Sequence, residues 1–288
     1  MAEALNFGML RAAGEYIARI DADDLMTPDR LMKQIAYMDE HPNVIVCGGW
    51  QQYFDRSTYL HKPPSSAEQC RTNLLFRCDL CHSTVMLRKQ VFCENNLFYD
   101  PNYAAEDFEL WSRAIGYGEI TNMPEVLGYY REHDCSITTA KKDQLVFQQG
   151  EIVAKTIERY FGIALSPTQM RYFSGWTNPF FDARQGITKK ERKSAWSDLM
   201  SILSLIYQRN QVVQFCGEQE LACTLRAEWV ALRYNAPFEL EEKSITDIRQ
   251  IFAKKRRSQI LLQKLRGFCK NYRGFRRKYW KIKSVLKG

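Results

Sequence analysis

The first half of the chain alternates short apolar stretches with longer amphipathic ones, a pattern typical of an α/β layer structure. The short stretches are bounded by Gly, Pro and Asp, whereas the longer ones repeat their apolar residues every three or four positions. The pattern predicts strands at residues 15–20, 44–47 and 83–88, helices at 2–13, 28–40, 67–77 and 105–116, and a strand pair or loop at 50–66.

Two of these helices have predictable ends and faces. Thr27 is a suitable N-cap with Pro28 at the first helical position, and Pro42 prevents the helix from continuing. The apolar residues expected on one face of this helix are Leu31, Ile35 and Met38. Those expected on the inner face of the helix at 105–116 are Leu110, Trp111 and Ala114.

Beyond residue 140 the pattern becomes helical. Long periodic stretches at 144–161, 188–208 and 217–234 are separated by Gly, Asn and Pro breakers. We therefore divide the chain into an α/β domain at 1–140, a helical region at 141–250 and a basic tail at 251–288.

Composition and charge narrow the class of protein. The 288 residues contain no apolar run of about 18 residues, so no transmembrane helix is expected, and the N-terminus lacks the pattern of a signal peptide. The nine cysteines are scattered and odd in number, which favours a reducing cytoplasm over a disulfide scaffold. Cys70, Cys78, Cys81, His82 and Cys93 offer one paired zinc-ligand spacing without a second, so buried free thiols are the preferred interpretation.

The positive charge is concentrated in the tail. Residues 251–288 contain 14 Lys or Arg and no Asp or Glu. Because the whole chain has a net charge of +8, residues 1–250 have a net charge of 8 − 14 = −6. Aromatic and aliphatic residues interleave with these charges, which favours an amphipathic helix on an anionic membrane surface. Nucleic-acid binding and a solvated tail remain the alternatives.

Two pairs of carboxylates are candidates for chemistry. Asp21 and Asp23 bracket one small residue where a predicted strand ends, and hard oxygen ligands at that spacing suit Mg²⁺ or Mn²⁺ with a bound phosphate. Glu106 and Asp107 lie in the first turn of a predicted helix. Helix capping and the helix dipole are the structural alternatives for the two pairs.

Five motifs occur in a fixed order: Asp21-Ala22-Asp23-Asp24; Thr27 to Leu31 with Gln34, followed by His41-Pro42; Cys81 to Arg88; Ala105 to Trp111; and Tyr129 to His133. Together with the run from Ala4 to Gly8 and from Ala13 to Ile20, they resemble the middle of a family 2 glycosyltransferase with the GT-A fold. The resemblance covers about half of the chain and ends near residue 140.

The resemblance implies a site and a reaction. Asp21 and Asp23 match the metal motif for Mn²⁺ or Mg²⁺, and Asp107, with Glu106 beside it, matches the base that activates an acceptor hydroxyl. The remaining matches are Asn6, Arg19, Asp21, Asp24 and Arg131 on the donor side, and His82 and His133 on the acceptor side. The implied reaction is inverting transfer of a sugar from a nucleotide-diphosphate donor to a glycan or lipid-linked acceptor in bacterial surface polysaccharide or lipopolysaccharide biosynthesis.

Family members start with a strand, a helix and a second strand that hold the nucleotide, whereas Met1 here falls just before the helix leading to Asp21. The resemblance therefore implies a truncated, Rossmann-like GT-A sheet with flanking helices, followed by an α-helical C-terminal region. A peripheral enzyme on the inner face of the bacterial cytoplasmic membrane is the leading hypothesis. An inactive, membrane-associated scaffold and a nucleic-acid-binding protein are the alternatives, with nucleic acid the less favoured partner.

Overall fold

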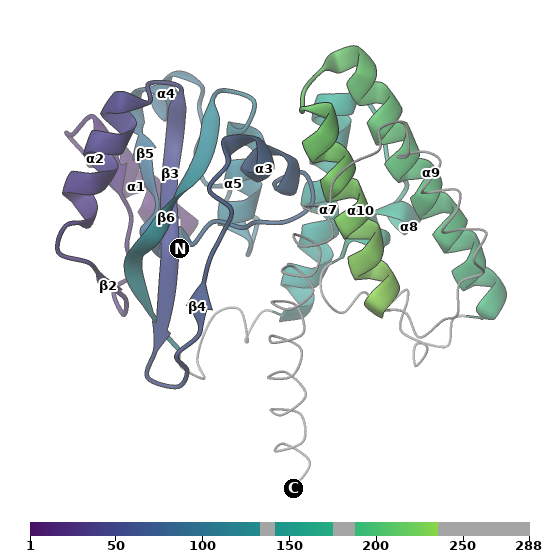
Figure 1. Cartoon of the computed structure of the whole chain (residues 1–288), viewed down its shortest axis with the longest axis horizontal. Coiled ribbons are helices and arrows are strands. Elements are labelled where there is room, and N and C mark those ends of the chain that lie inside the picture. The colour runs from purple at the N-terminus through teal and green to yellow at the C-terminus, as the bar shows by residue number, and fades with distance from the viewer. Residues whose placement is uncertain (133–141, 175–187, 236–288) are drawn as a thin grey trace, which may run out of the picture.

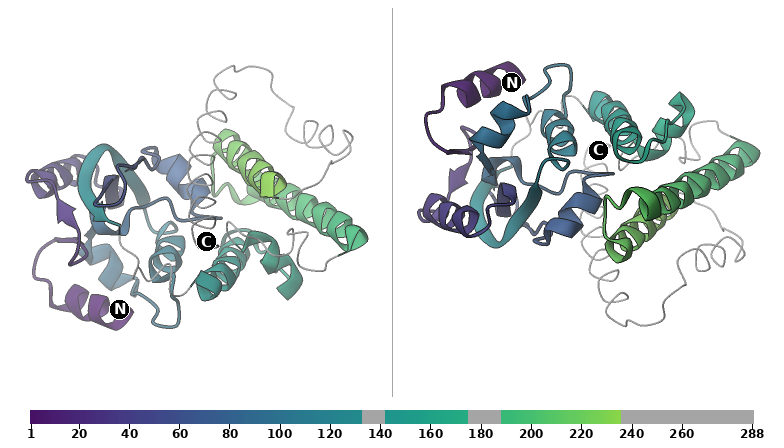
Figure 2. Two further views of the ribbon diagram at one scale, coloured as in Figure 1. Left: turned by 90° about the horizontal axis from the view of Figure 1, so that it is seen from below. Right: turned by 90° about the horizontal axis from the view of Figure 1, so that it is seen from above.

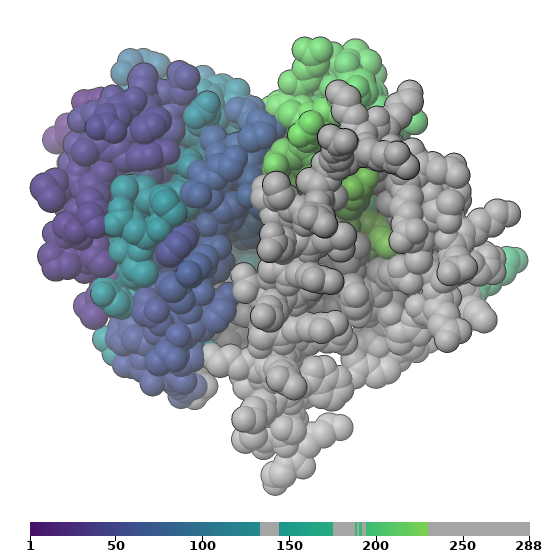
Figure 3. All heavy atoms as spheres, viewed as in Figure 1, coloured from purple at the N-terminus to yellow at the C-terminus, as the bar shows by residue number. Residues whose placement is uncertain are grey.

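A computed structural model describes residues 1–132, 142–174 and 188–235 of the chain. Figure 1 shows a sheet with its helices beside a group of long helices. In both views of Figure 2 the helices α9 and α10 lie on the side of the molecule away from α1 and α2. Figure 3 shows residues 1–132 filling one side of the molecule. The boundaries predicted at 140 and 250, the basic tail and His133 lie outside the described residues.

The described residues form a six-stranded mixed sheet in the order β1-β5-β3-β6-β2, with β4 paired to β3. Its strands are β1 (Tyr16–Ala18), β2 (Leu25–Met26), β3 (Val44–Phe54), β4 (Leu60–His61), β5 (Met86–Arg88) and β6 (Glu119–Arg131). β3 and β6 run parallel from Val44 opposite Glu119 to Phe54 opposite Arg131, and the other pairs are antiparallel. The predicted α/β class is confirmed.

Short helices accompany the sheet: α1 (Ala2–Arg11), α2 (Arg30–Glu40), α3 (Ala67–Asn73), α4 (Lys89–Glu94) and α5 (Glu106–Ala114). Leu110, Trp111 and Ala114 are buried on α5 as predicted. The predicted strand at 83–88 is shorter than expected, because a 3₁₀ turn at His82–Thr84 precedes β5.

The prediction for α2 was wrong in two respects. Its N-cap is Asp29 rather than Thr27, and Leu31 and Ile35 are 39% and 40% exposed. The buried face consists of Arg30, Gln34 and Met38, so two polar side chains occupy positions where apolar ones were expected. The reason is a set of buried backbone carbonyls beneath α2 that need hydrogen-bond donors.

The helical region contains α7 (Lys142–Phe161), α8 (Pro167–Met170), α9 (Lys189–Val213) and α10 (Glu218–Asn235), so its three long helices are confirmed. α7 packs against α5, and α10 packs against α3. Buried side chains of both parts, such as Phe76, Ile152, Phe173 and Leu221, belong to one apolar cluster. The helical region therefore shares a core with the elements that carry the candidate site. No helix in the described ranges has the length and apolar character needed to cross a membrane.

Candidate active site

The acidic loop after β1 is organised by a buried arginine. The Arg19 guanidinium donates to both carboxylate oxygens of Asp21, at 2.5 and 2.7 Å, and to the Ser83 hydroxyl at 3.0 Å. The Ser83 hydroxyl in turn donates to Asp21 Oδ2 at 2.9 Å. A bidentate pair of this kind fixes the carboxylate in orientation as well as in position.

The buried face of α2 donates hydrogen bonds to the backbone that leads into this loop. Arg30 is 1% exposed, and its guanidinium donates to the carbonyl oxygens of Ser83 at 2.7 Å, Arg19 at 2.9 Å and Val85 at 3.0 Å. Gln34 accepts from Arg30 Nε and donates to the Thr84 carbonyl at 2.9 Å. Burial, assisted by the charge of Arg19, lowers the pKa of Arg30 to about 10, so this guanidinium stays charged at neutral pH. These side chains join the acidic loop to the segment that precedes β5.

The end of β6 closes the other side of the acidic loop. Asp24 is buried, and its Oδ1 accepts from the backbone N–H of Arg131 at 2.9 Å. Its Oδ2 is buried without a hydrogen-bond partner within the described parts of the chain, and burial raises the pKa of this carboxyl. The Arg131 guanidinium donates to the Asp23 carbonyl at 3.0 Å and to Asp55 at 2.7 Å. Arg131 thus lies beside the acidic loop, and donor binding by Arg131 stays a prediction.

The two carboxylates at the start of α5 lie within the electrostatic influence of Arg19. Glu106 is buried, and Asp107 Oδ1 accepts from the Phe108 N–H at 2.8 Å. Burial raises the pKa of both carboxyl groups, and the charge of Arg19 partly offsets that effect. The charge of Asp21 further raises the pKa of Asp107. The charges of Arg19 and Asp21 thus act in opposite directions on the Asp107 carboxyl.

An aromatic group surrounds His82, which lies in the segment before β5. His82 Nε2 and the Tyr99 hydroxyl share a hydrogen bond of 2.9 Å, and both rings lie against Trp111. Burial holds the pKa of His82 well below its usual value, with a smaller contribution from the charge of Arg19. His82 is consequently neutral at physiological pH, and a neutral imidazole suits a hydroxyl ligand better than a phosphate.

Tyrosines form a second aromatic group next to the acidic loop. The Tyr53 ring lies 4.8 Å from that of Tyr130 and 5.4 Å from that of Tyr59, measured between centroids. Burial raises the pKa of Tyr130, and the charges of Asp24 and Asp23 add to this effect. Partly exposed rings beside carboxylates are a common lining of polar-ligand sites.

The structure brings most of the predicted residues together. Arg19, Asp21, His82, Glu106 and Asp107 form one cluster. Asp23, Asp24 and Arg131 border it. Asn6 lies outside the cluster and makes two hydrogen bonds of 2.8 Å with the backbone of Tyr99, so donor binding by Asn6 stays a prediction, as does acceptor binding by His133.

Four residues of the site were not predicted: Arg30, Gln34, Ser83 and Tyr99. The available signal was positional. Arg30 and Gln34 lie four residues apart in line with the buried Met38, and Ser83 belongs to the segment already singled out around His82.

The oxygen ligands that the site offers to a metal ion are the carboxylates of the acidic loop. In the described residues no group of three or more His, Cys, Asp and Glu side chains is arranged to hold a metal. Asp21 and the exposed Asp23 offer hard oxygens at the edge of the site, and Asp24 Oδ2 is an unpartnered buried oxygen in the described part of this loop. A Mg²⁺ or Mn²⁺ ion with one or two carboxylates and a substrate diphosphate suits this arrangement.

Comparison with known proteins agrees with the sequence resemblance. Residues 1–98 match the family model described as Glycosyl transferase family 2. The chain is 30% identical over 136 residues to an uncharacterised glycosyltransferase of Haemophilus influenzae, covering 46% of this chain and 50% of that protein. It is 32% identical over 130 residues to the amylovoran biosynthesis glycosyltransferase AmsE of Erwinia amylovora, covering 44% and 48%. The chain thus spans about half the length of the curated relatives it matches.

Among solved structures, the chain is similar to S. aureus TarS 1–349 in complex with UDP-GlcNAc. The identity is 13% and the TM-score 0.47, over 84% of this chain and 74% of that one.

Proposed function

We propose, from the membership of residues 1–98 in glycosyl transferase family 2, that the protein transfers a sugar from a nucleotide-diphosphate donor to a hydroxyl of a glycan or lipid-linked acceptor. The observation that supports the proposal is that the charges of Arg19 and Asp21, which are hydrogen-bonded to each other, both act on the Asp107 carboxyl. This arrangement offers a base and a diphosphate-binding loop in one site.

The donor side consists of the acidic loop. Asp21 and Asp23 would hold Mg²⁺ or Mn²⁺, which supplies charge stabilisation to the departing diphosphate. Arg19, already bound to Asp21, and Arg131, at the end of β6, are placed to donate to phosphate oxygens. Asp24 keeps the loop and β6 together through the Arg131 N–H.

The acceptor side carries the base. The acceptor oxygen attacks the anomeric carbon, its proton passes to the Asp107 carboxylate, and the nucleoside diphosphate leaves with the electron pair of the broken C–O bond. Attack opposite the leaving group inverts the anomeric carbon. Glu106 is the adjacent carboxylate that would orient the acceptor. A raised pKa makes Asp107 a stronger base than an ordinary aspartate.

The acceptor class follows from the same site. The neutral His82 and Tyr99 pair offers hydrogen bonds to hydroxyl groups, and the Tyr53, Tyr59 and Tyr130 rings offer apolar faces to a sugar. AmsE, a relative, is named for amylovoran biosynthesis, which supports surface polysaccharide or lipopolysaccharide assembly as the setting. The basic residues of 251–288 would bring the enzyme to the anionic inner face of the cytoplasmic membrane.

The test is a titration of the full chain with UDP, GDP and CDP, each with Mn²⁺ and with EDTA, followed by thermal unfolding. One nucleotide is expected to raise the melting temperature only when Mn²⁺ is present, and Asp23→Ala is expected to remove that shift. Glu3→Ala, which changes an exposed carboxylate on α1, serves as the control. A folded chain with no metal-dependent shift for any nucleotide would support the inactive-scaffold alternative.

A further inference from the structure

The loop that leads into α5 connects the candidate base to the helical region. Residues 95–105 join α4 to α5 and carry Tyr99, which contacts His82. The N-cap of α5 is Ala105, and no side chain caps this helix end. The positions of Glu106 and Asp107 therefore depend on how the backbone just before them is held.

A side chain from α7 holds that backbone. Gln148 accepts from the Ala104 N–H at 2.7 Å and donates to the Asn102 carbonyl at 2.7 Å, and its side chain is 9% exposed. Both polar atoms of the amide are used on the loop. Because Ala104 lies two residues before Glu106 and three before Asp107, these bonds fix the start of α5.

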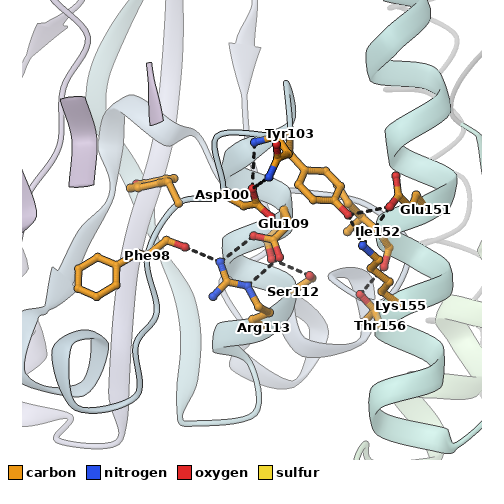
Figure 4. Close-up of polar contacts among 12 residues, drawn as sticks. Phe98, Asp100, Tyr103, Glu109, Ser112, Arg113, Glu151, Ile152, Lys155 and Thr156 are labelled. Carbon is orange, nitrogen blue, oxygen red and sulfur yellow. Dashed lines mark hydrogen bonds and ion pairs between the residues drawn. The ribbon is translucent and has the colours of Figure 1, made fainter. Parts of the chain in front are cut away.

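Tyr103 provides a second connection between the same loop and α7 (Figure 4). Its ring is buried, and its hydroxyl lies 3.0 Å from Glu151 Oε1 and 2.6 Å from Lys155 Nζ. Glu109 and Arg113 add a third contact from α5 to the loop, through the Phe98 carbonyl. Helix α7 thus contacts residues 102–104 of the loop, while Arg113 of α5 contacts Phe98 nearer its start.

We propose that α7 positions the catalytic carboxylates and that Gln148 is the positioning residue. The inference rests on the proposed function, since it assumes that Asp107 acts on the attacking oxygen. It gives the helical region a role in the chemistry, because a displacement of about 1 Å in a reacting group can lower a rate by about 100-fold. Donor binding is expected to be independent of Gln148, because the acidic loop is held by Arg19 and Ser83, whereas Gln148 bonds Ala104 and Asn102.

The kinetic experiment compares Gln148→Ala with Phe147→Ala in the full chain. Phe147 is the preceding residue of α7 and is 65% exposed, so its variant controls for a change in the same turn. The measurements are Mn²⁺-dependent release of nucleoside diphosphate from UDP-, GDP- and CDP-sugars and the Kd of the matching nucleoside diphosphate. Gln148→Ala is expected to lower kcat by about 10- to 100-fold and to leave this Kd within about twofold. An unchanged kcat, or a loss of kcat and nucleotide affinity together, would overturn the proposal.

Hydrogen exchange tests the positioning role without relying on activity. In Gln148→Ala, the amides of residues 100–108 are expected to exchange at least about tenfold faster, while those in the middle of α5 and α7 keep their rates. Phe147→Ala should leave both sets unchanged. If the wild-type protein releases no nucleoside diphosphate, the proposed function fails. Faster exchange confined to residues 100–108 in Gln148→Ala would still show that Gln148 holds the start of α5. Unchanged or uniformly faster exchange would refute it.

Discussion

Asp107 lies in surroundings that oppose its charged form. Burial raises its folded-state pKa above the unfolded value, so the stability that this carboxyl contributes is complete below the unfolded pKa and is lost as pH rises through the folded pKa. At neutral pH the charge therefore destabilises the fold. Asp107→Asn is expected to lower sugar transfer by at least about 100-fold while the melting temperature stays equal or rises. A lower melting temperature, or retained activity, would contradict the assigned role.

The same shift sets the pH dependence of the reaction. Transfer requires the Asp107 carboxylate, so the rate falls as pH drops through its pKa. Because burial raises that pKa above 3.8, the acid limb of the pH–rate profile is expected at a higher pH than for an ordinary aspartate. The measurement is kcat between pH 4 and 8, alongside circular dichroism that shows the protein folded throughout. An acid limb at or below the ordinary value would mean that another group is the base.

Arg30 illustrates a structural charge that supports the site without entering it. Arg30→Ala removes the side-chain donor to the Ser83 and Arg19 carbonyls and one of the two donors to the Val85 carbonyl, and it opens a cavity. The expected cost is about 3 kcal/mol or more in free energy of unfolding. Lys33→Ala, on the same helix, removes only solvent-exposed ion pairs and is expected to cost less than about 1 kcal/mol. Urea unfolding gives the free energy of unfolding of both variants. Equal losses would show that the buried hydrogen bonds of Arg30 stabilise the fold no more than the surface ion pairs of Lys33.

For single residues, the sequence identifies the charged side chains proposed for the chemistry. It does not identify the side chains that hydrogen-bond to buried backbone carbonyls and so support the site. Asp21 and Asp107 stand in recognisable motifs, and the charge of Asp21 acts on the Asp107 carboxyl. Arg30 and Gln34 sit on the inner face of α2, where polarity normally indicates exposure to solvent, and nothing local reveals the carbonyls that they satisfy. Ser83 and Tyr99 gain their partners only from contacts between distant segments.

Among the elements, the strands differ most from the prediction: β6 was not predicted, and the central strand β3 is much longer than expected. The sequence predicts 44–47, whereas β3 extends from Val44 to Phe54 and pairs with β6 along this length. Gln51 and Gln52 interrupt the apolar pattern that marked the strand, and pairing with a distant parallel strand is not visible in local periodicity. The helices were predicted more closely, because their period of 3.6 residues is expressed within a single segment.

The close approach of β3 and β6 can be tested with glycines. A Cβ added at Gly49 would lie 2.4 Å from Leu127 Cδ1 in the sheet, whereas one added at Gly8 in α1 meets no atom within 4 Å. Gly49→Ala is expected to lower the free energy of unfolding by about 1–3 kcal/mol, and Gly8→Ala to raise it by up to about 1 kcal/mol. Denaturant unfolding of the two variants gives the comparison. Two changes of the same sign would contradict the packing described for β3.

Considered as a whole, the molecule joins two kinds of structure around one core. The sequence divides the chain where strand patterns end, yet α10 contacts α3 through Thr224, which bonds Thr72 at 2.9 Å. A largely buried ion pair joins Glu228 of α10 to Arg77, which follows α3. Such contacts between segments about 150 residues apart have no periodic signature, which is why the sequence suggested no purpose for the helical region. The contacts of the helical region with α3 and with the loop before α5 suggest the positioning role proposed above.

The uneven charge of the whole chain leads to the last prediction. Residues 1–250 carry −6 and would be repelled by an anionic bilayer, so binding must come from the 14 basic residues of 251–288. Replacing Arg273, Arg276, Arg277 and Lys278 with Gln in the full chain removes four charges at about 1 kcal/mol each, which lowers the partition coefficient onto anionic vesicles by about 100- to 1000-fold. Co-sedimentation with vesicles containing phosphatidylglycerol measures this, with phosphatidylcholine vesicles as the control. Salt is expected to weaken the wild-type binding. Equal vesicle binding by the variant and the wild type would mean that other residues contact the membrane. Tight, salt-sensitive binding to duplex DNA without vesicle binding would instead favour nucleic acid as the partner of the tail.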